Sequence, residues 1–177
     1  MQIYIALLRG INVSGKNKIL MTDLKNLFEK LQCIDVKTYI QSGNVIFKSD
    51  IKDKEDLANL ISLKIEDTYG FKIPVIIKKD TEIQQIITNN PFYSDNVDTK
   101  KLYVTYLDSA PKDITKLKAF DFGKDVYAIV EDVIYLKYDI GAGKTKLTNA
   151  IMEKKLNVIA TSRNWRTTNK IKDLVCD

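Results

Sequence analysis

Residues Ile3–Ile19 (IYIALLRGINVSGKNKI) join an apolar strand to a polar loop that contains glycine. Ile3–Leu8 has the length and the apolar composition of a buried β-strand. It leads directly into Arg9–Lys18, which contains two glycines, two asparagines and three cationic side chains. A glycine-containing loop that follows a strand is a common way to present N–H groups and cations to an anion. The segment therefore predicts the first strand of a sheet and, next to it, a candidate ligand loop.

The residues that follow continue the alternation of strands and helices. Apolar periodicity predicts a helix near 22–31, a hairpin of strands 36–41 and 45–48 that turns at Gly43-Asn44, a helix over 54–68, a strand over 73–78 and a short helix from Thr81. The first half of the chain thus has the order βαββαβ, followed by a helix.

The second half repeats this order. It predicts a strand over 102–107, a short helix over 114–120, a hairpin of strands 126–130 and 133–137 that turns at Glu131-Asp132, a helix over 145–156, a strand over 157–160 and a terminal helix from Arg163. We therefore predict an α+β protein of two tandem ferredoxin-like subdomains (βαββαβ plus helix) that arose by internal duplication. The expected boundaries are 1–90 for the first subdomain, 91–100 for a linker and 101–177 for the second.

Comparison of the two halves marks the polar loop as an insertion. Tyr4–Leu8 matches Tyr103–Leu107 at an offset of 99 positions, whereas Val45–Phe47 matches Val133–Tyr135 at an offset of 88. The first half therefore carries about eleven extra residues, which correspond to Gly10–Leu20. A segment present in one copy of a repeat is not required by the fold and is a candidate for function. In a ferredoxin-like unit this loop lies at the same sheet edge as the hairpin turn.

The amino-acid composition limits the reactions and partners that the chain can have. The chain has no histidine, which excludes the usual general base near neutral pH and the His-dependent nucleophile pairs. The net charge of +5 slightly favours anionic partners. Two distant cysteines, no long apolar run and no leader-like start predict a cytoplasmic protein without a membrane partner. We expect no metal site, since no carboxylates have a recognisable catalytic or ligand spacing, and we expect no cofactor.

Arginine is scarce among the cationic residues. Only Arg9, Arg163 and Arg166 occur among 28 basic residues. A guanidinium differs from lysine in its planar, bidentate hydrogen bonding to carboxylate or phosphate. Each arginine is therefore a candidate either for a ligand contact or for an internal pair that holds a loop.

Three segments carry a family resemblance: Tyr4–Ile19 (YIALLRGINVSGKNKI), Tyr39–Phe47 (YIQSGNVIF) and Ala160–Trp165 (ATSRNW). Together they resemble a widespread bacterial family of conserved hypothetical proteins, a domain of unknown function. The chain has Ser14 and Ser162 where the family pattern has Gly and Thr. The resemblance implies paired α+β subdomains in a bacterial cytoplasmic protein, and it implies no substrate, cofactor or catalytic residue.

The loop also approaches the phosphate-binding P-loop pattern, with Gly10 and Gly15-Lys16 at the required spacing. Asn17 stands where the pattern needs the hydroxyl of Ser or Thr to bind Mg²⁺. The following helix is expected to begin late, at Thr22, with Asp23 in a first turn that would repel phosphate. We reject a true P-loop and retain a looser anion site.

The candidate ligand residues combine cations, a glycine amide, side-chain amides and one aromatic ring. They are Arg9, Asn12, Gly15, Lys16, Asn17, Gln41, Ser42, Asn44, Arg163, Asn164 and Trp165. The alternative is that Asn12, Gln41, Ser42 and Asn44 only satisfy their own loop backbones.

Trp165 has two interpretations as well. Ser162 is expected to cap a helix that starts at Arg163 and carries Trp165 in its first turn. The ring then either packs in the core or stacks on a base or sugar between two cations.

Three functions follow from these residues. The first is binding of a phosphorylated small molecule, a nucleotide or a nucleic-acid segment at Arg9–Lys18. The second is a phosphoryl- or nucleotidyl-transfer enzyme that uses Mg²⁺ borne by its substrate. The third is a protein–protein interaction module in which a strand edge pairs with another chain. The oligomeric state is left open by the sequence.

Overall fold

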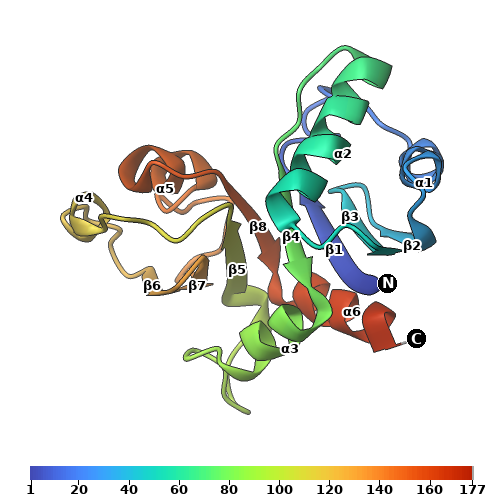
Figure 1. Cartoon of the computed structure of the whole chain (residues 1–177). Coiled ribbons are helices and arrows are strands. Elements are labelled where there is room, and N and C mark those ends of the chain that lie inside the picture. Colours follow the sequence, from blue (N-terminus) through green and yellow to red (C-terminus); the bar gives the residue numbers. More distant parts are fainter. Residues whose placement is uncertain (177) are drawn as a thin grey trace. The chain divides into compact units, whose positions relative to one another are not determined.

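The computed structural model of the chain describes residues 1–176, which form eight β-strands, six α-helices and one 3-10 helix, Thr99–Lys101 (Figure 1). The chain divides into two compact units. The first comprises residues 1–84 and the segment from Ile171, and the second comprises residues 85–170. The divisions fall inside helices α3 (Asp80–Thr88) and α6 (Trp165–Cys176).

The first unit is built on a four-stranded antiparallel sheet in the order β2-β3-β1-β4. Its elements are β1 (Gln2–Leu8), α1 (Met21–Lys30), β2 (Ile34–Tyr39), β3 (Asn44–Ser49), α2 (Lys54–Tyr69) and β4 (Val75–Lys79). Strand β3 is antiparallel to both β1 and β2, so the two flanking strands are parallel to each other. The end of β1 therefore lies beside the β2–β3 turn, as expected from the sequence.

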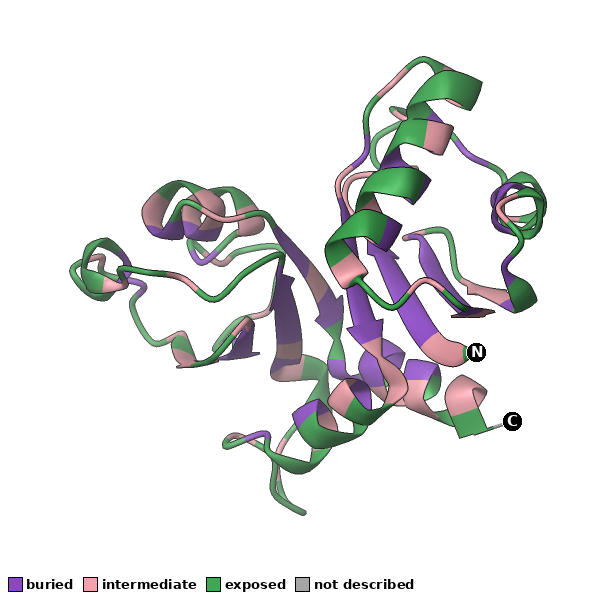
Figure 2. Cartoon of the chain, in the orientation of Figure 1, coloured by how far each residue is buried: buried purple, intermediate pink, exposed green. Residues whose placement is uncertain are grey.

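Strand β1 is buried on both faces of this sheet, which explains its continuous apolar sequence (Figure 2). Tyr4 and Leu8 belong to the hydrophobic core that also contains Leu24 and Phe28 of α1. The intervening Ile5 is likewise fully buried, on the opposite face.

Helix α2 is bounded by strong local signals. The Asp53 carboxylate accepts hydrogen bonds from the N–H groups of Glu55 and Asp56, at 2.8 and 2.9 Å, and so caps the N-terminus. At the other end Gly70 has a φ of +77° and its N–H donates to the Glu66 carbonyl. These two residues fix the ends of a helix that apolar periodicity predicted to within one residue.

The second unit contains a sheet of the same kind, in the order β6-β7-β5-β8. Its elements are β5 (Leu102–Leu107), α4 (Thr115–Lys118), β6 (Val126–Val130), β7 (Val133–Lys137), α5 (Asn149–Leu156) and β8 (Ala160–Asn164). Leu107, Ile134 and Leu136 from the sheet pack with Leu147 and Met152 in one core. The chain thus has a mixed α+β fold with two four-stranded antiparallel sheets.

Strand registers correct one detail of the comparison between the halves. Leu7 lies opposite Asn44, and Tyr106 lies opposite Val133, so the second offset is 89 rather than 88. The first unit has ten more residues between these points, and two of them lie in the longer β2–β3 turn. The error matters because a one-residue slip exchanges the two faces of a strand. The core residue that corresponds to Val45 is Ile134.

The end of the chain also departs from the sequence prediction. The last strand spans Ala160–Asn164, not 157–160, because these residues form a ladder with β5. Helix α6 consequently begins at Trp165. Helix α5 begins at Asn149, four residues later than predicted, with Thr148 as its N-cap. The Thr145 hydroxyl, predicted to lie at the helix start, donates instead to the Asp125 carboxylate.

Among residues 1–176, no helix combines the length and the apolar character needed to cross a bilayer.

Candidate functional site

The polar loop after β1 contacts the β2–β3 turn. The Leu8 N–H donates to the Gly43 carbonyl at 2.9 Å, and the Asn12 side-chain amide donates to the Gln41 carbonyl at 3.0 Å. Gly43 has a φ of +76°, and a Cβ at this position would lie 2.6 Å from Ile11 Cδ1 and 2.8 Å from Leu8 Cβ. Only glycine permits the turn to approach the loop so closely.

The loop contains a small β-hairpin, residues Asn12–Asn17, which we call the finger. The Lys16 N–H donates to the Val13 carbonyl at 2.9 Å, and the Asn12 N–H donates to the Asn17 carbonyl at 3.1 Å. The two turn residues, Ser14 and Gly15, have φ of +50° and +76°, as in a type I′ turn. Residues 13–16 are all exposed. The loop therefore contains a hydrogen-bonded hairpin whose four central residues are exposed.

Two asparagines attach the finger to the protein. The Asn12 side chain donates to the Ile19 carbonyl and accepts from the Ile19 N–H, both at 2.9 Å. The Asn17 side chain donates to the Gly10 carbonyl at 3.0 Å. Asn12 and Asn17 have φ of +54° and +47°, a conformation that asparagine tolerates better than most residues. Both amides, which the sequence offered as ligand contacts, are thus engaged in holding the loop.

The turn residues are engaged in the same way. Asn44 is fully buried, and its side-chain amide donates to the Tyr39 carbonyl at 2.9 Å and to the Ser42 hydroxyl at 3.1 Å. Gln41 is exposed, and its carbonyl accepts from Asn12. For Asn12, Ser42 and Asn44 the geometry matches the alternative in which these residues satisfy the loop and turn, and Gln41 takes part through its backbone carbonyl. Asn17, which that alternative did not include, bonds to the backbone in the same way.

Cations and apolar side chains remain at the surface of this region. Lys16 and Lys18 are exposed, whereas Arg9 is half-buried and its backbone N–H donates to the Pro74 carbonyl at 3.0 Å. Val13 and Ile40 are 59% and 46% exposed. The finger therefore presents Lys16 beside an uncovered apolar side chain.

Helix α1 does not complete a P-loop. It begins at Met21, five residues after Lys16, and its N-cap, Leu20, makes no side-chain capping bond. Asp23 lies in its first turn. A phosphate held by Lys16 would therefore gain nothing from the N-terminus of this helix, and the rejection of a P-loop stands.

The segment Arg163–Trp165 lies in the second unit and differs from its prediction. Ser162 is not an N-cap; it lies in β8, and its hydroxyl contacts the Thr105 hydroxyl at 2.6 Å. Asn164 takes the capping role, because its side-chain oxygen accepts from the Thr167 N–H at 2.8 Å. Sequence reasoning missed this because Ser and Asn are equally good caps, and only the β5–β8 ladder decides between them.

Arg163 and Trp165 are buried in that unit. Arg163 is 6% exposed and donates to the Thr161 hydroxyl and the Ser162 carbonyl, both at 2.8 Å. Burial lowers the pKa of its guanidinium to about 10, so the group stays cationic at neutral pH. Trp165 is 5% exposed, with its ring centroid 5.4 Å from that of Tyr93. The core interpretation of Trp165 therefore matches the structure.

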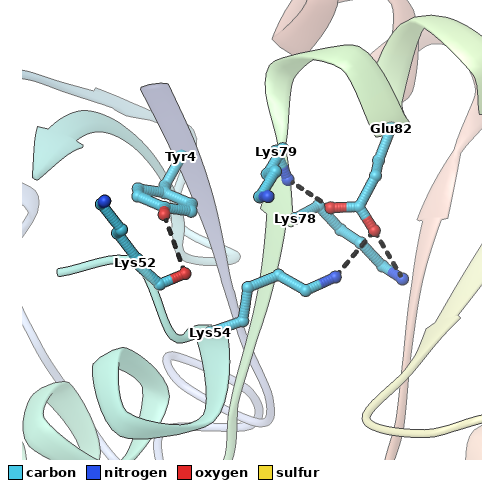
Figure 3. Close-up of polar contacts among 6 residues, drawn as sticks. All are labelled: Tyr4, Lys52, Lys54, Lys78, Lys79 and Glu82. Atoms are coloured by element: carbon cyan, nitrogen blue, oxygen red, sulfur yellow. Dashed lines mark hydrogen bonds and ion pairs between the residues drawn. The ribbon is translucent and has the colours of Figure 1, made fainter. Parts of the chain in front are cut away.

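One polar cluster was not anticipated (Figure 3). The Glu82 carboxylate accepts from Lys54 Nζ and from the Lys79 backbone N–H, each at 2.8 Å, and lies 4.0 Å from Nζ of Lys78. The Lys78 side chain is 1% exposed. Nearby, the Tyr4 hydroxyl donates to the Lys52 carbonyl at 3.2 Å. Glu82, three residues after Lys79 at the start of α3, makes the backbone bond of a capping-box glutamate. Lys79 stands where the capping box has Ser or Thr, so the sequence carried no clear signal for this cluster.

The carboxylates that the structure describes show no grouping suited to a metal ion. Among residues 1–176, no three His, Cys, Asp or Glu side chains come together in such a way. Asp35 is instead paired with Lys48 at 2.6 Å, and the hydrogen bond and charge of Lys48 lower the pKa of the Asp35 carboxyl.

Comparisons with known proteins give the context. A family model described as "Protein of unknown function (DUF1697)" matches residues 1–135. This range includes the finger and the β2–β3 turn but not Arg163–Trp165. Among solved structures, the chain is similar to one described as a conserved bacterial protein, SP0830, from Streptococcus pneumoniae, with a TM-score of 0.78 and 23% identity over 100% of this chain and 99% of that chain. No curated protein matches the sequence.

Proposed function

The chain belongs to the family of proteins of unknown function DUF1697, and we propose that it binds a nucleic acid through the phosphate groups that the finger contacts. The observation that carries the proposal is the exposed tip, residues 13–16, on a hairpin whose base is fixed by Asn12 and Asn17. Lys16 on the finger and the neighbouring Lys18 supply the positive charge.

The shape of the finger favours an extended polyanion over a small ligand. Small ligands are held by polar groups that converge on them, yet the amides of Asn12, Asn17 and Asn44 bond to their own backbone. A projecting two-stranded hairpin suits the opposite arrangement, in which the protein element enters a groove of the ligand. The major groove of DNA admits a two-stranded β-ribbon. Lysine contacts to phosphates would supply the affinity.

Fluorescence anisotropy with a labelled duplex and a labelled single strand, over a range of salt concentrations, tests the proposal. Each lysine that contacts a phosphate contributes about 0.9 to the slope of log K against log salt for a duplex. The variant K16A/K18A should therefore bind more weakly and lose up to about 1.8 of that slope. The control K116A/K118A removes two exposed lysines of α4 and should match the wild type. Equal effects of the two variants, or no salt-dependent binding by the wild type, would refute the proposal.

The small-ligand alternative has its own measurement. A panel of nucleotides and sugar phosphates is tested for thermal stabilisation of the wild type and of K16A/K18A. Stabilisation that depends on Lys16 and Lys18, without binding to either nucleic acid, would replace the proposal by a small phosphorylated ligand. Transfer of a phosphoryl or nucleotidyl group would appear as Mg²⁺-dependent turnover in the same panel.

The finer architecture forms part of the same proposal. The shared strand order supports two ferredoxin-like subdomains that arose by duplication. We keep the proposed boundaries of 1–90 and 101–177 around a linker at 91–100, although the compact units divide after residue 84 and the first unit includes the segment from Ile171. Limited proteolysis should then cut first within 91–100, where residues 93–96 are exposed. A cytoplasmic location is consistent with the two free thiols, Cys33 and Cys176.

A further inference from the structure

Strand β6 lies at the edge of the second unit's sheet, and all five of its residues are apolar (Val126–Val130, VYAIV). Val126 and Val130 are 44% and 47% exposed. An edge strand has a row of N–H and C=O groups that no neighbouring strand pairs, and apolar side chains make such an edge a template for another strand. This surface is separate from the finger and is not used by the proposed nucleic-acid binding.

The other sheet edges carry the usual protection against pairing. Strand β2 has a register shift between Ile34 and Lys37, and a charged Asp35 within it. Strand β4 ends in two lysines, and β8 contains Arg163. Of the four edge strands in the part of the chain that the structure describes, β6 alone has neither a charged residue nor a register shift. Its pairing with β7 is continuous, so its outer edge is straight enough to accept a partner.

The register of β6 identifies which backbone groups face outward. Val130 and Val133 flank a two-residue turn and are the first and fourth residues of a β-turn, which share a hydrogen bond. Opposed residues of an antiparallel pair alternate between bonded and non-bonded positions, so Ala128 also bonds to β7. The N–H and C=O groups of Tyr127 and Ile129 therefore point toward the free edge.

We infer that β6 pairs in antiparallel fashion with β6 of a second copy of this chain, about a two-fold axis at Ala128. In this register Tyr127 of one copy lies opposite Ile129 of the other, and both positions have outward backbone groups, so each such pair exchanges two hydrogen bonds. Val126 lies opposite Val130. An aromatic residue opposite a β-branched one is among the favourable cross-strand pairs. The strand is thus complementary to itself in both backbone and side chains.

The side chains on the core-facing side of β6 support the same register. Tyr127 and Ile129 pack against the second unit's hydrophobic core, so the pairing continues that core across the axis. The result is a single eight-stranded antiparallel sheet built from two copies of the second sheet.

The charges beyond the strand ends are compatible with this arrangement. Lys124 of one copy comes opposite Asp132 of the other, with opposite charge. Asp125 comes opposite Glu131, which has the same sign, but the Asp125 carboxylate is held by the Thr145 hydroxyl and by the Asp139 N–H, within its own unit.

Sedimentation velocity of the full chain over a wide concentration range gives the first test, and a monomer–dimer equilibrium is expected. The variant V126K/V130K places like charges opposite each other in both pairs and should be monomeric. The variant V126E/V130K places opposite charges there and should dimerise again. Both positions are exposed, so far-UV circular dichroism should match the wild type. A wild type that stays monomeric, a dimer that V126K/V130K leaves intact, or a failure of V126E/V130K to restore it would overturn the inference.

Disulfide trapping tests the axis itself. Ala128 lies opposite its own copy in a non-bonded pair, where Cα atoms are about 4.5 Å apart, within the range of a disulfide. Under mild oxidation A128C/C176S should form a covalent dimer, whereas V130C/C176S should not, since Val130 faces Val126. Cross-linking of V130C/C176S as fast as that of A128C/C176S would show a different register and overturn the inference.

Discussion

Substitution of Gly43 by alanine should destabilise the first unit far more than the same change at glycines with the same backbone angle. Gly43, Gly15 and Gly70 have φ of +76°, +76° and +77°. An alanine in this conformation costs roughly 1–2 kcal/mol at any of them. At Gly15 and Gly70 an added Cβ meets nothing within 4 Å, so this backbone cost is the whole effect.

At Gly43 a steric cost is added. The new Cβ would lie 2.6 Å from Ile11 Cδ1 and 2.8 Å from Leu8 Cβ. The Ile11 methyl can rotate away, but Leu8 Cβ is fixed to a strand whose N–H donates to the Gly43 carbonyl. Overpacking of this kind costs about 1–3 kcal/mol. The total for G43A is therefore about 2–5 kcal/mol, against about 1–2 for G15A and G70A.

Thermal unfolding followed by far-UV circular dichroism measures the difference. In a chain of this length 1 kcal/mol corresponds to about 2–4 °C, so G43A should melt roughly 2–12 °C below G15A and G70A. The double variant G43A/I11V removes the Ile11 Cδ1 contact and should recover part of the loss, with the Leu8 contact remaining. If the three single variants melt together, the close packing of the turn against the loop is wrong.

Four further predictions concern the first unit. N12A removes three side-chain hydrogen bonds, two donated and one accepted, and places alanine at a φ of +54°. The free energy of unfolding should fall by about 2–4 kcal/mol, and amide exchange should become faster in the finger than in β3. Exchange that rises equally in both would contradict an anchoring role for Asn12. E82A should lower the free energy of unfolding by about 1–3 kcal/mol. E82Q should lower it less, because its side-chain oxygen still accepts from the Lys79 N–H. A loss of stability that is the same in high salt would argue against a contribution from the charge of Glu82. Burial raises the pKa of the Cys33 thiol to about 11, so only the exposed Cys176 should react with a thiol reagent in the native protein, which C176S checks directly. Because this pKa is raised above the ordinary thiol value of 9.0, the stability that Cys33 contributes is complete below pH 9.0 and is lost as the pH rises through about 11, an effect that C33A should remove.

Local patterns were sufficient for much of the fold. The strands β5, β6 and β7 lie where the apolar runs predict them, because two-residue turns and charged flanks define their ends. Helix α2 was found from its apolar periodicity, and its ends agree closely with the prediction because both of its caps, Asp53 and Gly70, are local. The prediction was less accurate between 145 and 165, where Thr145 bonds to Asp125 on a different segment and Ala160–Asn164 joins β5. Contacts of that range cannot be recognised in a short window of sequence.

The candidate site, like the fold, has features that the local sequence predicted and features that it did not. Glycines and asparagines located the loop, since these residue types adopt positive φ most readily. Five of the seven residues with positive φ in 10–17 and 40–43 are Gly or Asn. Their residue types did not show which partner each amide would take. Asn44 bonds locally, to the Tyr39 carbonyl. Asn12 reaches the Gln41 carbonyl and Glu82 binds Lys54 only because segments distant in sequence meet there.

The order of the elements, the family and the position of the polar loop are properties of the linear chain, because apolar periodicity, turn residues and a continuous motif express them within a few residues of one another. Which groups the loop exposes is a property of the folded molecule. In the folded chain Arg9–Lys18 contains a hairpin that exposes Lys16 and does not form a concave anion site. The side-chain amides that could have lined such a site are hydrogen-bonded to the backbone of the loop and turn. Folding likewise leaves the apolar β6 at a sheet edge, where an otherwise ordinary strand becomes a surface for association.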